Sequence, residues 1–317
     1  MRWERRLAVT MLLALGAADA KAQSWPTRPV EVIIPFSAGG SSDVIGRSVA
    51  TALSELLGQQ AVVSNRDGAS GTIGFNALAT AAADGYTIGF GPTTPIANAP
   101  YLVKGVRYQV DSFDYICQVF ENPFTLAVAP ESRIKSARDL LAAARESPGK
   151  LSYGHSGTGT IPHLSVENFT DALDLKLQGV PFRGESTMMS VLLKGDIDLG
   201  VLAVVTIRGR NFRPLLIFAE RRHPALPDVP TDKELGVTTS VPPGHQGLFA
   251  PKGLRSEVRA ALESACASAM TRDVVRRAID NAGHTITYLT GAQFRAQTEA
   301  EHKFKSELIR RLGLTAQ

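Results

Sequence analysis

The chain has 317 residues, and its 34 Lys and Arg residues against 30 Asp and Glu residues leave a formal net charge of +4. Hydrophobic residues make up 44% and charged residues 20%, a balance that excludes an intrinsically disordered chain. The small net charge, with no Lys and Arg run interleaved with aromatic residues, argues against nucleic acid as a partner. At about 100–200 residues per domain, the length predicts about two domains.

The first residues carry the pattern of a secretory signal. Arg2, Arg5 and Arg6 form a basic start, residues 7–18 are apolar, and small residues surround the end at Ala22. The apolar stretch is shorter than the about 20 residues that cross a bilayer. An ordinary first helix is the alternative. We expect residues 1–22 to be removed as a signal peptide and the mature protein to be soluble and periplasmic.

Strands, glycine-rich loops and helices alternate along most of the chain. Short apolar runs predict strands, and apolar residues at helical spacing predict helices. The predicted elements, in chain order, are a strand at 30–35, a helix at 43–57, strands at 61–63 and 86–90 around a helix at 74–83, a strand at 124–128, a helix at 140–145, a strand at 151–154, a helix at 164–173, a strand at 179–181, a helix at 185–193, strands at 198–205, 215–219 and 247–250, and helices at 255–270, 273–281 and 292–312. Residues 91–113 look irregular. This order predicts βαβ units, a mostly parallel sheet and an α/β fold.

Two cysteines, Cys117 and Cys266, lie far apart in the sequence. In an oxidising compartment a disulfide between them is possible. Two separate buried thiols, acting as small apolar residues, are the alternative that the sequence favours, because two cysteines in a large chain are not a disulfide framework.

Two glycine-rich loops, residues 37–43 and 156–163, lie directly before or at the start of predicted helices and carry hydroxyl side chains beside their glycines. A helix N-terminus has unpaired N–H groups and the positive end of the helix dipole, so it suits an anion. Ligands of α/β folds lie at the carboxyl ends of parallel strands, where both loops fall. The alternative is that the glycines only turn the chain.

Neither loop fits a nucleotide-binding or catalytic motif. Both lack G-x-x-x-x-G-K-[ST] and G-x-G-x-x-G. Residues 154–157 begin like the G-x-S-x-G elbow of hydrolases, but Thr158 stands where the last glycine is needed. The histidines show no metal-ligand spacing. We therefore expect no catalytic residue, no cofactor and no metal.

Several motifs in order resemble the Bug-type extracytoplasmic solute receptors, the TctC-like receptors of tripartite tricarboxylate transporters. The run 32–43 followed by Arg47 is similar to the opening of that family, and residues 65–74 resemble its second loop, although Pro is usual where Asp67 stands. The resemblance extends over residues 25–253. Further matches, in order, are residues 84–87, 148–154, 163–164, 180–184, 195–199 and 224–231.

The resemblance implies a periplasmic-binding-protein-like fold, with two α/β domains around a ligand cleft as in a Venus flytrap. It places domain one at residues 25–121 plus 247–317 and domain two at residues 122–246. It also implies that loop backbone and hydroxyl groups hold a ligand carboxylate, partly through water. By position, the expected ligand contacts are Phe36, Ser37, Ala38, Gly39, Gly40, Ser41, Gly71, Thr93, Ser156, Thr158, Gly159, Thr160 and His163.

Charged residues near these loops are expected to act differently. We expect Asp43 to favour a helix N-terminus and Arg66 to brace a loop, whereas Arg183 could face the cleft or form a salt bridge. Residues 201–205 are apolar where the family commonly has an aspartate-containing turn. A buried ammonium needs an acidic partner, so we expect a carboxylate ligand without one, unless Asp198 or Glu185 reaches the cleft.

The function that the resemblance implies is that of a monomeric receptor. It captures a small organic acid and delivers it to the membrane subunits of a transporter. The alternative is a binding module that reports its ligand to a sensor kinase, and the sequence does not separate the two. An exported hydrolase is disfavoured, because the nucleophile motif is incomplete.

Overall fold

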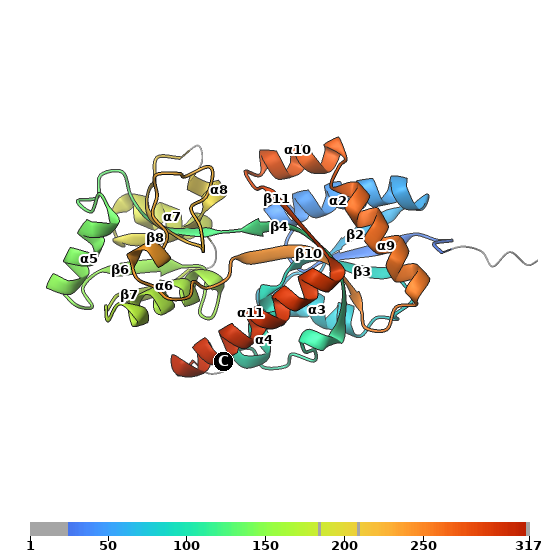
Figure 1. Ribbon diagram of the computed structural model, residues 1–317, viewed down its shortest axis with the longest axis horizontal. Helices are drawn as coiled ribbons and strands as arrows, with labels where there is room; N and C mark the ends of the chain where they lie inside the picture. The colour runs from blue at the N-terminus through green and yellow to red at the C-terminus, as the bar shows by residue number, and fades with distance from the viewer. Residues whose placement is uncertain (1–24, 183–184, 208–209, 315–317) are drawn as a thin grey trace, which may run out of the picture.

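The computed structural model describes residues 25–182, 185–207 and 210–314. They form two lobes, each built on its own β-sheet with helices packed against it (Figure 1). We call the lobe around the sheet of β1 to β4, β10 and β11 the first lobe, and the lobe around the sheet of β5 to β9 the second lobe. The predicted signal peptide, residues 1–22, lies outside the described residues.

The first lobe has a sheet with the strand order β11-β4-β10-β3-β1-β2. Strand β1 pairs in parallel with β2 and β3, whereas the pairings of β10 with β3 and β4, and of β11 with β4, are antiparallel. Its elements are β1 (Val30–Ile34), α2 (Ser41–Leu57), β2 (Ala61–Asn65), a 3-10 turn (Ala69–Gly71), α3 (Thr72–Ala79), β3 (Thr87–Pro92), α4 (Thr94–Leu102), a 3-10 turn (Val110–Ser112), β4 (Phe113–Asn122), β10 (Gly244–Pro251), α9 (Ser256–Ala269), α10 (Asp273–Asn281), β11 (Ile286–Thr290) and α11 (Gly291–Arg311).

The second lobe has a sheet with the strand order β7-β6-β8-β5-β9. Strand β6 is parallel to β7 and β8, and β5 is antiparallel to β8 and β9. Its elements are β5 (Phe124–Val128), α5 (Ala137–Glu146), β6 (Ser152–His155), α6 (Ile161–Ala172), β7 (Gln178–Pro181), α7 (Glu185–Lys194), β8 (Leu199–Ala203), α8 (Val204–Ile207), β9 (Arg213–Phe218) and a 3-10 turn (Lys233–Leu235).

The α/β fold with two domains is confirmed, but the prediction of a mostly parallel sheet is wrong. The βαβ spacing correctly gives the parallel strands β1 to β3 and β6 to β8. The strands that carry the chain between the lobes run back against their neighbours, so each sheet is mixed. The stretch 91–113, expected to be irregular, contains α4. Strands β4 and β11 were not predicted. The strand predicted at 198–205 ends at Ala203, where α8 takes over.

Strand β1 packs against helices on both faces of the first-lobe sheet and so stabilises the first lobe. Its apolar run is buried on both faces, as expected for a central strand. Val32 faces the cluster that includes Ile45 and Val49 of α2, spaced one helical turn apart, whereas Ile33 faces the cluster around Phe75 of α3. Two layers of helix therefore cover this sheet, and they fix the loops at its carboxyl edge.

The chain passes from the first sheet to the second where only Pro123 separates β4 from β5. It has returned to the first sheet by Gly244, which pairs with Asn122 at the start of β10. The two connections therefore lie side by side, and both are visible between the lobes in Figure 1. The domain boundaries expected at residues 121/122 and 246/247 stay a prediction.

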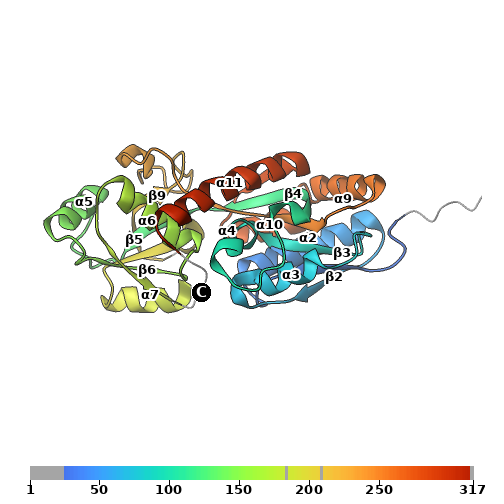
Figure 2. The same ribbon diagram turned by 90° about the horizontal axis from the view of Figure 1, so that it is seen from below.

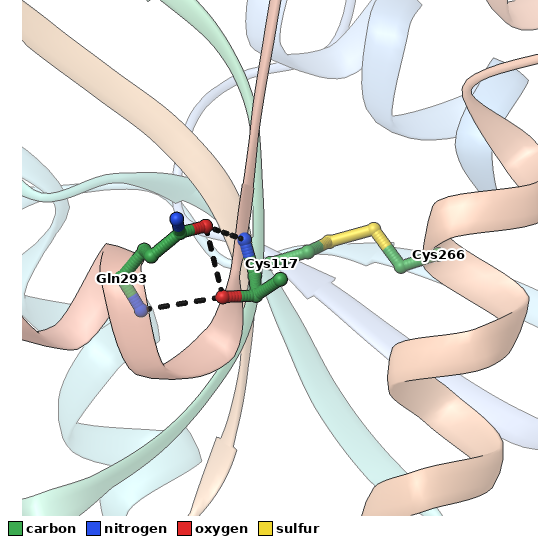
Figure 3. Close-up of a disulfide and its surroundings, with 4 residues drawn as sticks. Cys117, Cys266 and Gln293 are labelled. Atoms are coloured by element: carbon green, nitrogen blue, oxygen red, sulfur yellow. Dashed lines mark hydrogen bonds between the residues drawn. A yellow bond between two sulfur atoms is a disulfide. The ribbon is translucent and has the colours of Figure 1, made fainter.

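Cys117 of β4 and Cys266 of α9 form a disulfide, with their Cα atoms 6.5 Å apart (Figure 3). The expectation of two separate thiols is therefore wrong. Both residues lie in the same buried cluster of the first lobe, because α9 packs on the face of the sheet that Cys117 points to. Gln293, labelled nearby, caps the start of α11 together with Thr290, which pairs with Cys117 across the sheet.

Candidate functional site

A cavity of about 360 Å³ lies between the lobes, beside the two connections. Both lobes contribute to its wall, so a ligand held there would contact both. Its lining residues are Phe36, Ser42, Ser70, Pro92, Thr94, Pro95, Asn122, Phe124, Ser156, Thr160, Ile161, Pro162, Gly244 and Gln246.

Helices α2, α4 and α6 begin at this cavity. Residues of their first turns line it: Ser42 of α2, Thr94 of α4, and Ile161 of α6. In the described part of the chain, none of the corresponding N-cap residues accepts a hydrogen bond through its side chain from the helix it precedes. The first N–H groups of α2 therefore lack a side-chain acceptor, whereas Pro95 and Pro162 each remove one N–H from the first turns of α4 and α6. The positive ends of the three helix dipoles converge on one space.

The cavity wall itself carries no charge. Among the described residues, every side chain that lines it is either apolar or a neutral hydroxyl or amide. Phe36 and Phe124 supply aromatic surface from opposite lobes. Ser42 Oγ donates to Gln246 Oε1 at 3.2 Å, and the buried Asn122 Oδ1 has no hydrogen-bond partner within the described residues. The site thus offers neutral donors, apolar surface and an amide oxygen.

Of the ligand contacts expected at residues 36–41, Phe36 is the described side chain that lines the cavity, and Ser42, which was not expected as a contact, lines it as well. Residues 37–40 are exposed, and the side chain of Ser41 is outside the described ones. Ser37 Oγ donates to Asp67 Oδ2 at 2.7 Å. The N–H of Gly39 donates to Asp43 Oδ2 at 2.9 Å. These polar groups hold the loop in shape.

Asp43 organises this loop from inside α2. Asn65 Nδ2 donates to Asp43 Oδ1 at 2.8 Å and to the carbonyl oxygen of Phe36 at 2.9 Å, while Arg47 Nε donates to Asp43 Oδ2 at 3.0 Å. Burial pushes the pKa of Asp43 upward, but the hydrogen bonds from Arg47, Gly39 and Asn65 outweigh it and hold the pKa below its usual value. The carboxylate stays ionised and fixes Phe36 at the cavity.

Residues 156–160 of the second predicted loop, 156–163, are held by two histidines whose rings lie close together. His155 and His163 lie with ring centroids 4.5 Å apart. His155 Nδ1 accepts from the N–H of Gly157 at 3.3 Å, and His163 Nδ1 accepts from the N–H of Gly159 at 3.1 Å. These N–H groups are therefore taken. His163, expected to contact ligand, is buried and is not among the described residues that line the cavity, and its Nδ1 orients the loop.

Burial, reinforced at His155 by repulsion from His163, lowers the pKa of each imidazole to about 4. At neutral pH both rings are uncharged, which leaves an unprotonated nitrogen to accept a hydrogen bond. Ser156 and Thr160 face the main cavity, whereas Thr158 and Gly159 line a smaller space of about 50 Å³ beside it.

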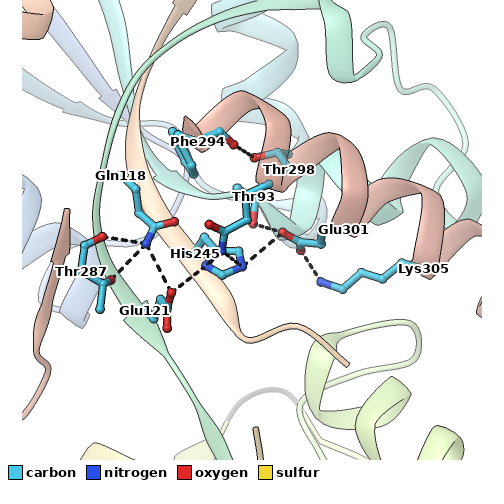
Figure 4. A network of polar contacts seen from close by, with 10 residues as sticks. Thr93, Gln118, Glu121, His245, Thr287, Phe294, Thr298, Glu301 and Lys305 are labelled. Carbon is cyan, nitrogen blue, oxygen red and sulfur yellow. Dashed lines mark hydrogen bonds and ion pairs between the residues drawn. The ribbon is translucent and has the colours of Figure 1, made fainter. Parts of the chain in front are cut away.

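Thr93 and Gly71 border the cavity without lining it. The hydroxyl of Thr93 donates to Glu301 Oε2 of α11 at 2.9 Å, and its N–H donates to the carbonyl oxygen of His245 of β10 at 2.8 Å, so both donors are engaged (Figure 4). Gly71 has φ +91°, and a Cβ there would lie 3.2 Å from the ring of Phe36. Gly71 therefore allows Phe36 to approach.

Sequence reasoning missed most of the polar residues that reach the cavity. Thr94 and Pro95 repeat the signal used for the other loops, a strand end followed by a helix start, but α4 was not predicted. Asn122 and Gln246 sit at the ends of the connecting strands. The sequence pattern of β4 gave no indication that its end would meet the start of β10.

The acidic residues that could have held an ammonium group are engaged elsewhere. Glu185 Oε1 accepts from the N–H of Ala203 at 2.5 Å, and its Oε2 accepts from Thr206 Oγ1 at 3.0 Å. Asp198 Oδ2 accepts from the N–H and the hydroxyl of Ser152 at the sheet edge. Leu202 is buried within β8 and does not line the cavity. Arg183 lies outside the described residues.

In the part of the chain that the structure describes, no group of three or more His, Cys, Asp and Glu side chains is placed to hold a metal ion. Among the helices of the same residues, none is both long and apolar enough to cross a membrane.

Arg66, expected to brace a loop, forms an ion pair with Glu31 at 2.8 Å.

Two lobes, paired connections and a cavity between the lobes define a solute-binding protein of the periplasmic-binding-protein type. A family model described as "Tripartite tricarboxylate transporter family receptor" matches residues 45–314. BugT of Bordetella pertussis (strain Tohama I) is 31% identical over 303 residues, which are 94% of this chain and 93% of BugT. The chain belongs to the tripartite tricarboxylate transporter receptor family, which includes Bug-type proteins.

Solved structures agree with this assignment. Rpa4515 of R. palustris, determined with adipate, superimposes with a TM-score of 0.80 at 28% identity, covering 93% of this chain and 100% of that one. MatC of Rhodopseudomonas palustris, with bound malate, gives a TM-score of 0.75 at 25% identity, covering 90% and 100%. The family consists of solute-binding receptors rather than enzymes.

Proposed function

We propose that this chain is a periplasmic receptor that binds a small carboxylate without an ammonium group. It delivers this acid to the membrane subunits of a tripartite tricarboxylate-type transporter. The observation that carries the proposal is the convergence of the starts of α2, α4 and α6 on a cavity whose lining side chains, within the described residues, are all uncharged. The adipate in Rpa4515 and the malate in MatC support the same ligand class.

A carboxylate fits this cavity without a cationic partner. Each helix start is worth about 0.3–1 kcal/mol to an anion in its first turn, and charge-assisted hydrogen bonds add to this. The N–H of Ser156 is a candidate donor in the loop before α6, because within the described residues the histidines accept from the N–H groups of Gly157 and Gly159 and not from it. The hydroxyls of Ser156 and Thr160 line the same wall. Neutral donors of this kind also permit release, which a receptor needs.

An ammonium group does not fit. It presents three donors, and leaving it unpaired away from water costs several kcal/mol. Glu185 and Asp198 are engaged by other groups, and the described cavity wall has no carboxylate. Asn122 Oδ1 is a single neutral acceptor, better suited to a hydroxyl or a water.

The body of the acid is expected to be apolar. Phe36, Phe124 and Ile161 form much of the wall together with several prolines. Burying apolar ligand surface against them contributes about 25 cal/mol per Å². Residues 201–205 do not supply this apolar surface, because Leu202 faces the core of the second lobe.

A thermal-shift screen of the protein lacking residues 1–22 tests the proposal. Adipate and malate are the first probes, followed by 3-phenylpropionate and other acids with larger apolar bodies. At a ligand concentration of 100 times the dissociation constant, linkage predicts a stabilisation of about 2.7 kcal/mol. Stabilisation only by amino acids or only by sugars would contradict the proposal.

An experiment in the cell distinguishes a transport function from a sensing function. The family description names a transporter receptor, which favours transport. Deleting the gene should abolish uptake of the radiolabelled acid identified in the screen. Normal uptake, together with a lost transcriptional response to that acid, would instead assign the protein to a sensor kinase.

A further inference from the structure

Helix α11 belongs to both lobes. It starts on the first-lobe sheet, where Phe294 is fully buried against Tyr115 and Phe249. It then runs across to the second lobe, as Figure 2 shows. At its far end Leu308 and Ile309 are 2% and 3% exposed. A helix that is anchored in one lobe and buried in the other constrains the angle between them.

The far end of α11 packs on α6. Leu308 and Ile309 form one apolar cluster with Ile161 and Leu164 of α6 and with Val241 of the segment that leads to β10. Beyond the cluster, Arg311 Nε lies 3.1 Å from Asp171 Oδ2 of α6. We call this contact region, Leu308, Ile309 and Arg311 against α6, the α11 clasp.

The α11 clasp lies directly behind the ligand cavity. Ile161 is shared, because it lines the cavity and also belongs to the apolar cluster with Leu308 and Ile309. Its neighbours Thr160 and Pro162 line the cavity as well. Movement of the α11 end would therefore move the start of α6, the second lobe's main contribution to the site.

The middle of α11 is fixed to the first lobe and to the connections. Glu301 and Lys305 form a fully buried ion pair, and Glu301 also accepts from Thr93, which precedes α4 (Figure 4). Gln297 Nε2 lies 2.7 Å from His245 Nε2 at the start of β10. Helix α11 thus links the start of α4, the connection and the start of α6.

A second contact joins the lobes on the cavity's flank. Asn98 Nδ2 of α4 donates to the carbonyl oxygen of Gly159 at 3.0 Å, and Leu102 packs so closely on Gly159 that a Cβ there would lie 2.1 Å from Leu102 Cδ1. The lobes are therefore in contact across the cleft in this structure.

We propose that Leu308 and Ile309 are positioning residues for the ligand site. They hold the start of α6 against the cavity and favour the closed arrangement of the lobes without touching the ligand. The inference goes beyond the receptor function and concerns the ligand-free protein. It can therefore fail while carboxylate binding holds, and the reverse is also true.

The test measures the distance between the lobes by pulsed electron resonance in the absence of ligand. Spin labels are placed at Ile73→Cys in α3 and Leu193→Cys in α7, which are 51% and 55% exposed. The native cysteines are bridged and do not take the label. Ile309→Ala should shift the distance distribution, or broaden it towards an open form. Ile309→Val keeps the branched contact and should restore the parent distribution.

Ile279→Ala is the matched control, because Ile279 is equally buried but lies in the first-lobe core, away from α6. It should lower stability and leave the distribution unchanged. An unchanged distribution in Ile309→Ala would overturn the proposal, and so would an equal shift in both alanine variants, which would indicate general loosening.

A charge change provides a second variant that preserves the apolar packing. Arg311→Glu places like charges opposite Asp171, whereas Arg310→Glu makes the same change at the neighbouring exposed position. Only Arg311→Glu should shift the distribution. If the binding-competent fraction falls to a tenth, the affinity for adipate or any other acid that binds falls about tenfold. Equal behaviour of the two variants would contradict a role for the clasp.

Discussion

Acid should weaken the folded protein through the stacked pair His155 and His163. In the unfolded chain an imidazole takes up its proton near pH 6.5, whereas burial lowers the pKa of each of these rings to about 4. Between these values the unfolded state binds more protons, so falling pH favours unfolding. This stability is complete above pH 6.5 and declines as the pH falls to about 4.

The size of the effect follows from the pKa values. Both rings are nearly inaccessible, at 2% and 8% exposed, so the shift applies with little screening. At about 1.4 kcal/mol per pKa unit, each ring accounts for at most about 3.5 kcal/mol. Near pH 5 the pair should contribute about 2 kcal/mol per pH unit to the slope of the unfolding free energy.

The variant His155→Asn/His163→Asn isolates this contribution. An Asn Oδ1 can accept from the N–H groups of Gly157 and Gly159 much as the imidazole Nδ1 does, but Asn does not titrate. Urea unfolding is measured for both proteins between pH 7.5 and 4.5. In the difference between them, the contributions of titrating groups common to both cancel, including that of Asp232, whose burial raises its pKa to about 6. The variant should lose less stability on acidification. Equal slopes would refute the reasoning.

Three further predictions concern the mature chain and its covalent and backbone features. Intact-mass measurement on periplasmic protein should find residues 1–22 absent, and a mass that includes Met1 would contradict the signal peptide. Replacing Cys117 and Cys266 by Ala should lower the unfolding free energy by about 4–5 kcal/mol, because the bridge closes a loop with a sequence separation of 149 residues; an unchanged urea midpoint would argue against the bridge. Gly149→Ala should lower the unfolding free energy by about 1 kcal/mol, because Gly149 has φ +73° but open space around it. Gly159→Ala should lower it by about 1–3 kcal/mol more, because Gly159 has φ +75° and a Cβ there would also meet the side chain of Leu102. Calorimetric melting measures both losses, and equal losses would contradict the prediction.

Local sequence patterns predicted the parts of the fold that local chemistry determines. The apolar run of β1, the glycine-rich loop and the spacing of α2 gave the first βα unit correctly. The sequence pattern did not predict the elements whose structure depends on pairing with residues far away in the sequence. Strand β4 pairs with β10 and β11, which follow it by more than a hundred residues, and this pairing makes the sheet mixed. The bridge between Cys117 and Cys266 has the same origin.

In the candidate site, too, local sequence predicted some residues, whereas contacts with other residues determined the placement of the rest. Phe36, Ser156 and Thr160 were expected from the loops and line the cavity. Residues 37–40 were expected on the same grounds but are exposed, because Asp43 draws the loop backbone onto α2. The role of His163 depends on its stacking with His155 and could not be predicted from spacing.

Calorimetric titration tests the central claim most directly, using an acid, its amino acid and its alcohol as a matched set. For a ligand such as 3-phenylpropionate these are 3-phenylpropionate, phenylalanine and 3-phenylpropanol; for adipate the amino acid is 2-aminoadipate. The cavity at the starts of α2, α4 and α6, with no charged side chain on its described wall, predicts that the acid binds at least tenfold more tightly than either relative. An amino acid that binds tenfold more tightly, or an alcohol that binds as well as the acid, would contradict the account.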